Sequence, residues 1–175
     1  MKNIKRINDQ LAVAMGQVTP DELQQAAQEG YKSVLNLRSP NEEGFLSDEQ
    51  QKTEKAGLTY VNVPVKPDGL SDALADQVLQ EIDQLPKPAL IHCKSGMRSG
   101  AMTLMYVAIQ QGLTADEAMA MGKQNGFDCD SSPQMKQFFE HYVSEHSKAS
   151  WSLSETHHSR PLQFNRLNEE ESLCH

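Results

Sequence analysis

With 175 residues and 38% hydrophobic content, the chain is most simply one domain with one modest core plus an extension. Its formal net charge of −8 argues against nucleic acid or an anionic membrane as a general partner. The three scattered cysteines do not suggest a disulfide framework, and no segment is apolar enough for a signal peptide or a membrane span, so we expect a cytoplasmic protein.

The first half of the chain predicts two short strands, followed by helices that alternate with strands. Strand formers gather at residues 4–7, 11–14, 31–37 and 58–65. Two helices have capped starts: Thr19 stands three residues before Glu22 as in a capping box, and Ser47 opens a similar polar sequence. Pro64 indicates that the fourth strand ends there or lies at an edge of the sheet.

The second half continues this alternation. We expect a strand at 89–92 and helices that begin at Ser71, just after residue 97, at Thr114 and at Ser132. Strands that alternate with helices predict an α/β fold, with a mostly parallel sheet covered by helices on both faces. In such folds the ligand binds beyond the carboxyl ends of the strands, where Arg38, Asp68 and Cys93 all fall.

The chain is organised around residues 89–99, in which an apolar strand ends at Cys93 and Arg98 opens a helical pattern. A strand, a short loop and a helix start bring several backbone N–H groups to one point, which suits an oxyanion. A cysteine at that point should be a thiolate, because the helix end and Arg98 both favour its charged form. A merely structural cysteine is the alternative, but a glycine and an arginine at these loop positions favour a nucleophile.

His92-Cys93, Gly96 and Arg98-Ser99 resemble the signature of the cysteine-dependent phosphatases, His-Cys-x5-Arg-Ser/Thr, with one loop residue fewer. The shorter loop, with the segments 16–23 and 33–38, resembles the phosphatase-like domain of the beta-lactamase hydrolase-like proteins, a branch of the dual-specificity phosphatase fold. The resemblance runs from about residue 4 to residue 142. The Cys-x4-Arg loop is also similar to the active-site loop of rhodaneses.

This resemblance implies a cysteine-phosphatase-like three-layer fold and a hydrolase of phosphomonoesters. The Cys93 thiolate would attack phosphorus and form a thiophosphoryl-enzyme that water hydrolyses. Ser99 would hydrogen-bond the sulfur and help to expel it from this intermediate. The phosphate would be held by the loop and the arginine, that is, by Lys94, Ser95, Gly96, Met97 and Arg98.

Three residues are expected to support this loop. Gly96 is needed if the backbone turns with positive φ to aim its N–H inward. His92 points away from Cys93 in an extended strand, so we expect it to order the loop through backbone hydrogen bonds. Arg38 is expected to support the site electrostatically, with simple solvation as the alternative.

The general acid is harder to assign. Phosphatases of this fold take it from a loop after an earlier strand, and Asp68 lies 93 − 68 = 25 positions before the cysteine. Asp68-Gly69 is equally well explained as turn chemistry, and Asp72 is the second choice. Glu42 and Glu43 are more distant candidates.

Two other functions remain open. In a sulfurtransferase, Cys93 would carry a sulfane sulfur as a persulfide, and the smaller loop suits a sulfur atom better than a phosphoryl group. A pseudo-enzyme would bind an anion or a phosphorylated partner through the same loop. The leading prediction is the phosphatase, acting on a phosphorylated protein or small molecule, without a cofactor, a metal, nucleic acid or a membrane.

The other cysteines and the end of the chain show no feature of an active site. Cys129 has no spacing that brings it to Cys93, so we do not expect it to act as a resolving thiol. We expect the catalytic domain to span 1–146 and a disordered tail to span 147–175, because the apolar periodicity ends there. His157-His158 and Cys174-His175 lack the spacing of a metal site.

Overall fold

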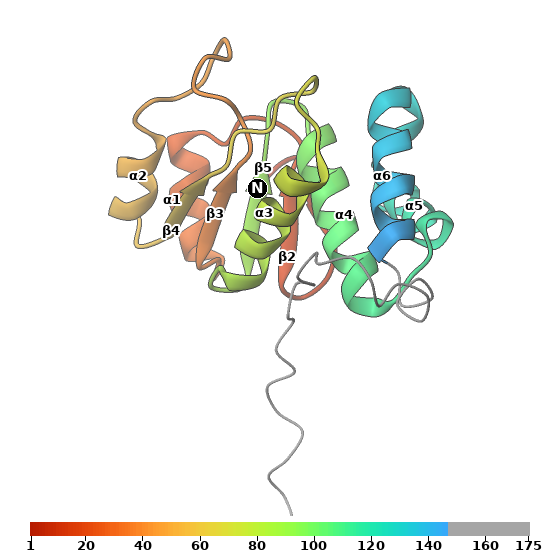
Figure 1. Cartoon of the computed structure of the whole chain (residues 1–175). Helices are drawn as coiled ribbons and strands as arrows, with labels where there is room; N and C mark the ends of the chain where they lie inside the picture. The colour runs from red at the N-terminus through yellow and green to blue at the C-terminus, as the bar shows by residue number, and fades with distance from the viewer. Residues whose placement is uncertain (147–175) are drawn as a thin grey trace, which may run out of the picture.

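The computed structural model of this protein describes residues 1–146; the predicted tail and its histidines lie outside that range. The described chain has an α/β fold with a five-stranded sheet in the order β1-β2-β5-β3-β4 (Figure 1). The strands are β1 (Ile4–Arg6), β2 (Leu11–Ala14), β3 (Ser33–Asn36), β4 (Thr59–Asn62) and β5 (Ala89–His92). Only β1 pairs antiparallel, so the predicted mostly parallel sheet is confirmed.

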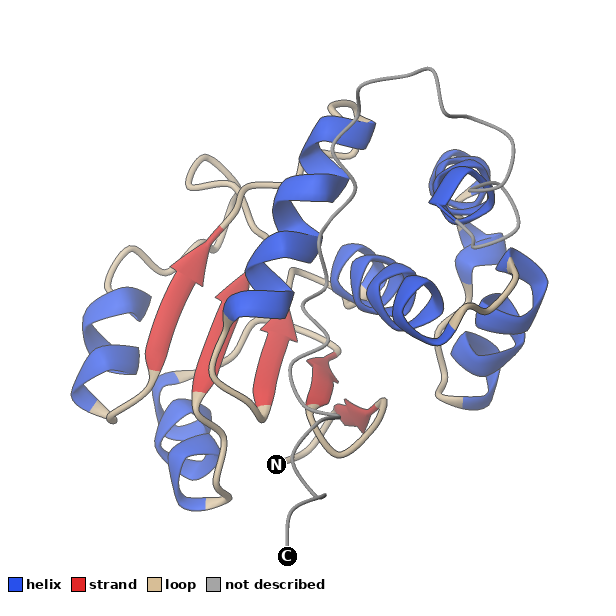
Figure 2. Ribbon diagram, turned by 60° about the horizontal axis from the view of Figure 1, so that its bottom comes forward, coloured by secondary structure: helices blue, strands red, loops and turns tan. Residues whose placement is uncertain are grey.

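Helices cover both faces of the sheet (Figure 2). The helical segments are α1 (Pro20–Gln28), α2 (Glu49–Lys55), α3 (Asp72–Gln84), α4 (Met97–Gln111), α5 (Ala115–Gln124), the 3-10 turn η1 (Cys129–Ser131) and α6 (Pro133–His146). Leu90 of β5 packs in the smaller core with α1, whereas Ile91 packs in the larger core with α3, α4 and α6. This alternation follows from the period of two in a strand. No helix within residues 1–146 is both long and apolar enough to cross a membrane.

Most of the predicted helix starts are confirmed by their caps. Thr19 and Thr114 each complete a capping box, and the Ser71 hydroxyl accepts from the Leu74 N–H. The start predicted at Ser47 is one residue early: the N-cap residue of α2 is Asp48, whose side chain makes no capping hydrogen bond. The side chain of Glu49 instead points into the protein, where it is 1% exposed.

The register of the sheet gathers three loops at one edge. Ala14 of β2 and Asn36 of β3 both lie opposite His92 of β5, so these parallel strands end level with one another. The chain after each strand therefore leaves the same edge, as sequence patterning predicts. β4 lies at the edge of the sheet, in agreement with the position of Pro64.

Helix α4 lies in the core of the molecule and carries the loop's arginine in its first turn. Every residue from Arg98 to Ala108 is buried, because α3, α5 and α6 all contact this helix. Close packing at its first turn requires a glycine: a Cβ on Gly100 would lie 2.6 Å from the Phe127 ring. The helix that follows Cys93 is thus fixed on all sides by the core.

Candidate active site

The predicted anion-binding loop is formed at the carboxyl end of β5. Gly96 has φ = 90°, as its predicted inward turn requires, and its N–H donates to the Cys93 sulfur at 3.1 Å. A Cβ at this position would meet the Met15 Sδ at 2.8 Å, so a side chain is excluded by contact as well as by conformation. Helix α4 begins at the next residue, Met97, which is half-buried, whereas Lys94 and Ser95 are exposed.

The Cys93 sulfur is buried and surrounded by donors. Its side chain has 0% exposure, and the Ser99 hydroxyl lies 3.3 Å from the sulfur. Burial raises the pKa of the Cys93 thiol, but hydrogen bonds from Ser99 and from backbone N–H groups, together with the charge of Arg98, hold the pKa below its usual value. The surroundings of Cys93 therefore shift its ionisation toward the thiolate, which is the direction that the sequence predicts.

The guanidinium of Arg98 is held by a carboxylate. Its Nη1 and Nη2 donate to Glu42 at 2.8 and 2.7 Å, and Nη1 also donates to the Val65 carbonyl at 2.9 Å. A guanidinium has five N–H donors, so within residues 1–146 the Nε–H and one Nη2–H, which share one edge, have no acceptor oxygen. The hydrogen bonds from Arg98 to Glu42 raise the pKa of the guanidinium, burial lowers it, and the charge of the neighbouring Cys93 raises it further.

Glu42 does not suit the role of general acid. Hydrogen bonding to Arg98, partly offset by burial, lowers the pKa of this carboxyl from 4.5 to about 2. Glu42 is consequently ionised at neutral pH and has no proton to give. Its neighbour Glu43 has an exposed side chain and contributes its backbone carbonyl, which accepts from Arg38.

The low pKa of Glu42 predicts a pH-dependent contribution to stability. A carboxyl whose folded pKa is depressed stabilises the fold above its unfolded pKa, and this contribution is lost as the pH falls toward the folded pKa. The window runs from about 4.5 down to about 2. Because the side chain is partly exposed, we expect a loss of about 1–2 kcal/mol, which the Glu42→Gln variant lacks. Urea unfolding of both proteins at several pH values measures it, and parallel stability curves would contradict it.

Arg38 is buried and fixes the loop that carries Glu42. It is 2% exposed, and its Nη1 donates to the Gln17 side chain at 2.6 Å and to the Gly44 carbonyl at 3.0 Å. Its Nε lies 3.5 Å from Glu42. Arg38 is therefore not a solvated surface residue, and it touches the carboxylate that holds Arg98.

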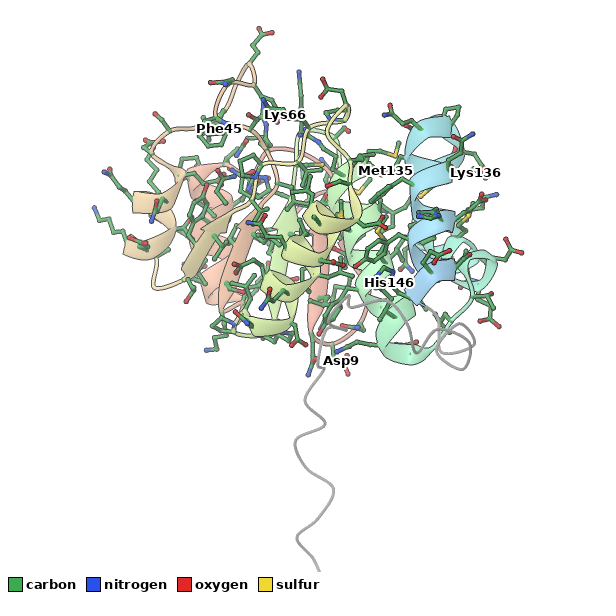
Figure 3. The ribbon with its side chains drawn as sticks, viewed as in Figure 1. Asp9, Phe45, Lys66, Met135, Lys136 and His146 are labelled. Atoms are coloured by element: carbon green, nitrogen blue, oxygen red, sulfur yellow. The ribbon has the colours of Figure 1, made fainter. Side chains whose placement is uncertain are left out.

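The two aspartates considered as acids lie in different surroundings. Asp68 is exposed in the loop after β4, the loop whose Val65 contacts Arg98, and within residues 1–146 its carboxylate makes no hydrogen bond or ion pair. Asp72, at the start of α3, lies 3.7 Å from His141 of α6. The loop after β4, which carries Asp68, and the loop after β3 lie at the same end of the molecule, as the positions of Lys66 and Phe45 in Figure 3 show.

His92 is held differently from the expectation. Its Nε2 lies 3.0 Å from the buried Glu49 carboxylate, and its Nδ1 has no hydrogen-bond partner among residues 1–146. The side chain of His92 thus links β5 to α2. It makes no hydrogen bond to the backbone of the 93–98 loop within residues 1–146, so the expected ordering of the loop by His92 through such bonds is not observed. Sequence reasoning missed Glu49, since an acidic residue in the first turn of a helix is ordinary.

The other described cysteine offers a contrast with Cys93. Cys129 lies in η1 and is 6% exposed, and burial together with Asp128 and Asp130 raises the pKa of its thiol. It lacks the features of an activated thiol. Within residues 1–146, no three His, Cys, Asp or Glu side chains are grouped in a way that could hold a metal ion.

Comparison with known proteins finds the phosphatase-like domain of the beta-lactamase hydrolase-like proteins, whose family model matches residues 3–124. A beta-lactamase hydrolase-like protein of Xylella fastidiosa Temecula1 is 35% identical over 126 residues, which are 70% of this chain. One from Agrobacterium fabrum is 29% identical over the same length. The aligned region is only 29% of each relative.

Solved structures share the fold at low sequence identity. A candidate phosphatase (DUF442) from Shewanella putrefaciens CN-32 has a TM-score of 0.72 and 18% identity, covering 84% of this chain and 95% of that one. TpbA of P. aeruginosa has a TM-score of 0.67 and 21% identity, covering 84% and 89%. This likeness supports the phosphatase fold assigned from the sheet and the loop.

Proposed function

This chain belongs to the family of phosphatase-like domains found in beta-lactamase hydrolase-like proteins, and we propose that it is a cysteine-dependent phosphatase of phosphomonoesters. The proposal is carried by the surroundings of the Cys93 sulfur, which accepts a hydrogen bond from the Gly96 N–H at 3.1 Å and lies 3.3 Å from the Ser99 hydroxyl. These groups stabilise a thiolate, and the first turn of α4 supplies the positive end of a helix dipole. The substrate is a phosphorylated protein or small molecule, and the reaction needs no cofactor.

In this reaction the thiolate attacks phosphorus, the ester oxygen leaves, and water then hydrolyses the thiophosphoryl-enzyme. Arg98 binds the phosphate oxygens through its Nε–H and second Nη2–H, while Glu42 keeps the other edge of the guanidinium. Asp68 protonates the leaving oxygen and later activates the water. When the cysteine is expelled again, Ser99 stabilises its returning charge. A reducing cytoplasm suits such a thiolate.

The size of the loop favours a second candidate, a sulfurtransferase. Only the residues 94–97 separate Cys93 from Arg98, and the Gly96 N–H already binds the sulfur itself. A loop that is one residue shorter than the phosphatase signature suits a smaller group, such as a single sulfur atom, better than a phosphoryl group. In that reaction the thiolate attacks the outer sulfur of thiosulfate, sulfite leaves, and a thiol or cyanide takes the sulfur from the resulting persulfide.

One experiment separates these functions. The purified chain is incubated with p-nitrophenyl phosphate, and in parallel with thiosulfate plus cyanide. We expect release of p-nitrophenol that the Cys93→Ser variant lacks, with little thiocyanate. Thiocyanate as the main product would replace the phosphatase with the sulfurtransferase. Phosphate binding without turnover of either substrate would instead support an anion-binding pseudo-enzyme.

A further inference from the structure

A continuous path of buried and half-buried contacts connects the two residues that flank the nucleophile loop, Arg98 and His92. Starting from Arg98, five successive contacts join Arg98, Glu42, Arg38, Gln17, Glu49 and His92. We call these six residues the Arg98–His92 network. Its two ends lie on either side of Cys93 in the sequence, and its middle members come from other loops and from α2.

Glu49 is the member of this network that no motif predicts. Its carboxylate is buried, and each oxygen has a partner. Oε1 accepts from Gln17 Nε2 at 2.5 Å. Oε2 accepts from Asn36 Nδ2 at 2.9 Å and lies 3.0 Å from His92 Nε2. A buried carboxylate is tolerated only where donors surround it in this way.

The roles of these partners are fixed by chemistry. An arginine and a backbone N–H only donate, so the oxygens of Gln17 and Asn36, which face Arg38 Nη1 and the Arg38 N–H, must be acceptors. The NH2 group of each amide therefore faces Glu49, which receives two N–H donors. The oxygen of Glu49 that accepts from Asn36 also faces His92 Nε2 at 3.0 Å, so we expect this nitrogen to carry the proton and to act as the third donor.

We propose that Glu49 is a positioning residue for the nucleophile loop. It fixes the Nε2–H tautomer of His92, holds the end of β5 against α2, and through Gln17 and Arg38 connects to the carboxylate that orients Arg98. The proposal rests on the proposed role of Cys93 as the nucleophile, whichever group the enzyme transfers. Two of its readouts are independent of any substrate.

The first readout is the tautomer in the unaltered chain. Two-bond 1H–15N correlation spectra of the 15N-labelled protein distinguish Nε2–H from Nδ1–H imidazoles, and the signal absent from His92→Asn assigns His92. We expect the Nε2–H form. Observation of the Nδ1–H tautomer of His92 would overturn the proposal. This measurement uses the unaltered chain, so it tests the proposal even if the Glu49 variant does not fold.

The second readout compares Glu49→Gln with Glu54→Gln, the same substitution at an exposed position of the same helix. In either orientation, the new amide sets a buried N–H against another N–H at Gln17 or at Asn36. The loop then relaxes and the donors to the sulfur are lost. Iodoacetamide labelling, followed on the Cys93 peptide across pH, should show a higher midpoint for Glu49→Gln and an unchanged one for Glu54→Gln.

Turnover supplies the third readout. We expect kcat for p-nitrophenyl phosphate to fall about ten- to hundredfold in Glu49→Gln, with KM changed much less, because misplacement of the nucleophile affects the chemical step. Adding Glu49→Gln to His92→Asn should move the labelling midpoint by less than the same change does in the wild type, since the route from Glu49 through His92 is already broken. Equal midpoints in Glu49→Gln and Glu54→Gln, or additive shifts in the double variant, would overturn the proposal. If the wild type lacks phosphatase activity, the proposed function fails, but the labelling and tautomer measurements still test whether Glu49 positions the loop.

Discussion

Replacing Cys93 with serine should remove turnover, with a loss of at least about 10⁴-fold. The hydroxyl of serine is far less acidic than a thiol, so the groups that lower the pKa of the Cys93 thiol do not make a serine at this position a comparable nucleophile. No described side chain within hydrogen-bond reach of this atom is a general base: among residues 1–146, the Ser99 hydroxyl is the only side-chain hydrogen-bond partner of the Cys93 sulfur. Initial rates with p-nitrophenyl phosphate measure the loss.

Cys129→Ser is the matched control, because it makes the same substitution at a buried thiol whose pKa is raised. This variant should keep its turnover. A second measurement is labelling with iodoacetamide at pH 6, where the Cys93 peptide should react faster than the Cys129 peptide. Equal activity losses in the two variants, or equal labelling of the two peptides, would contradict a single activated thiol.

Much of the fold could be predicted because its signals are local. The capping boxes at Thr19 and Thr114 are contained within four residues each, and the strand Ala89–His92 is a short apolar run between a proline and a polar loop. Such patterns need no knowledge of the rest of the chain. The start of α2 was less predictable, because Glu49 is directed inward by partners on β3, β5 and the loop after β2.

The parts of the site that could be predicted from the sequence are also local, whereas the parts that could not be predicted join distant residues. The turn at Gly96 and the contact between Ser99 and Cys93 lie within one segment; the loop pattern predicts the turn, and the resemblance to cysteine-dependent phosphatases implies the contact. The pairing of Arg98 with Glu42 joins residues 56 positions apart, and that of His92 with Glu49 joins residues 43 apart. Neither pairing has a local pattern, so the role of Glu42 as a fixed anion, and not an acid, required the folded structure.

Replacing Arg98 with lysine should lower kcat/KM for p-nitrophenyl phosphate by about 10²–10³-fold. Lysine keeps the positive charge, but its ammonium is a point charge with three donors in place of a planar fork with five. It cannot contact both oxygens of Glu42 and the Val65 carbonyl while presenting a second edge to phosphate. The loss should therefore appear mainly in the transition state, where charge on the phosphoryl oxygens is greatest.

The control for this substitution is Arg6→Lys, the same change at an exposed arginine of β1. Thermal unfolding should show Arg98→Lys close to the wild type, since the lysine still faces Glu42 with an opposite charge, and this separates catalysis from stability. The free edge of the guanidinium is the specific claim at risk. If Arg98→Lys retains full turnover while Cys93→Ser has none, the phosphate must be held by the loop amides alone, and the arginine serves only to anchor Glu42.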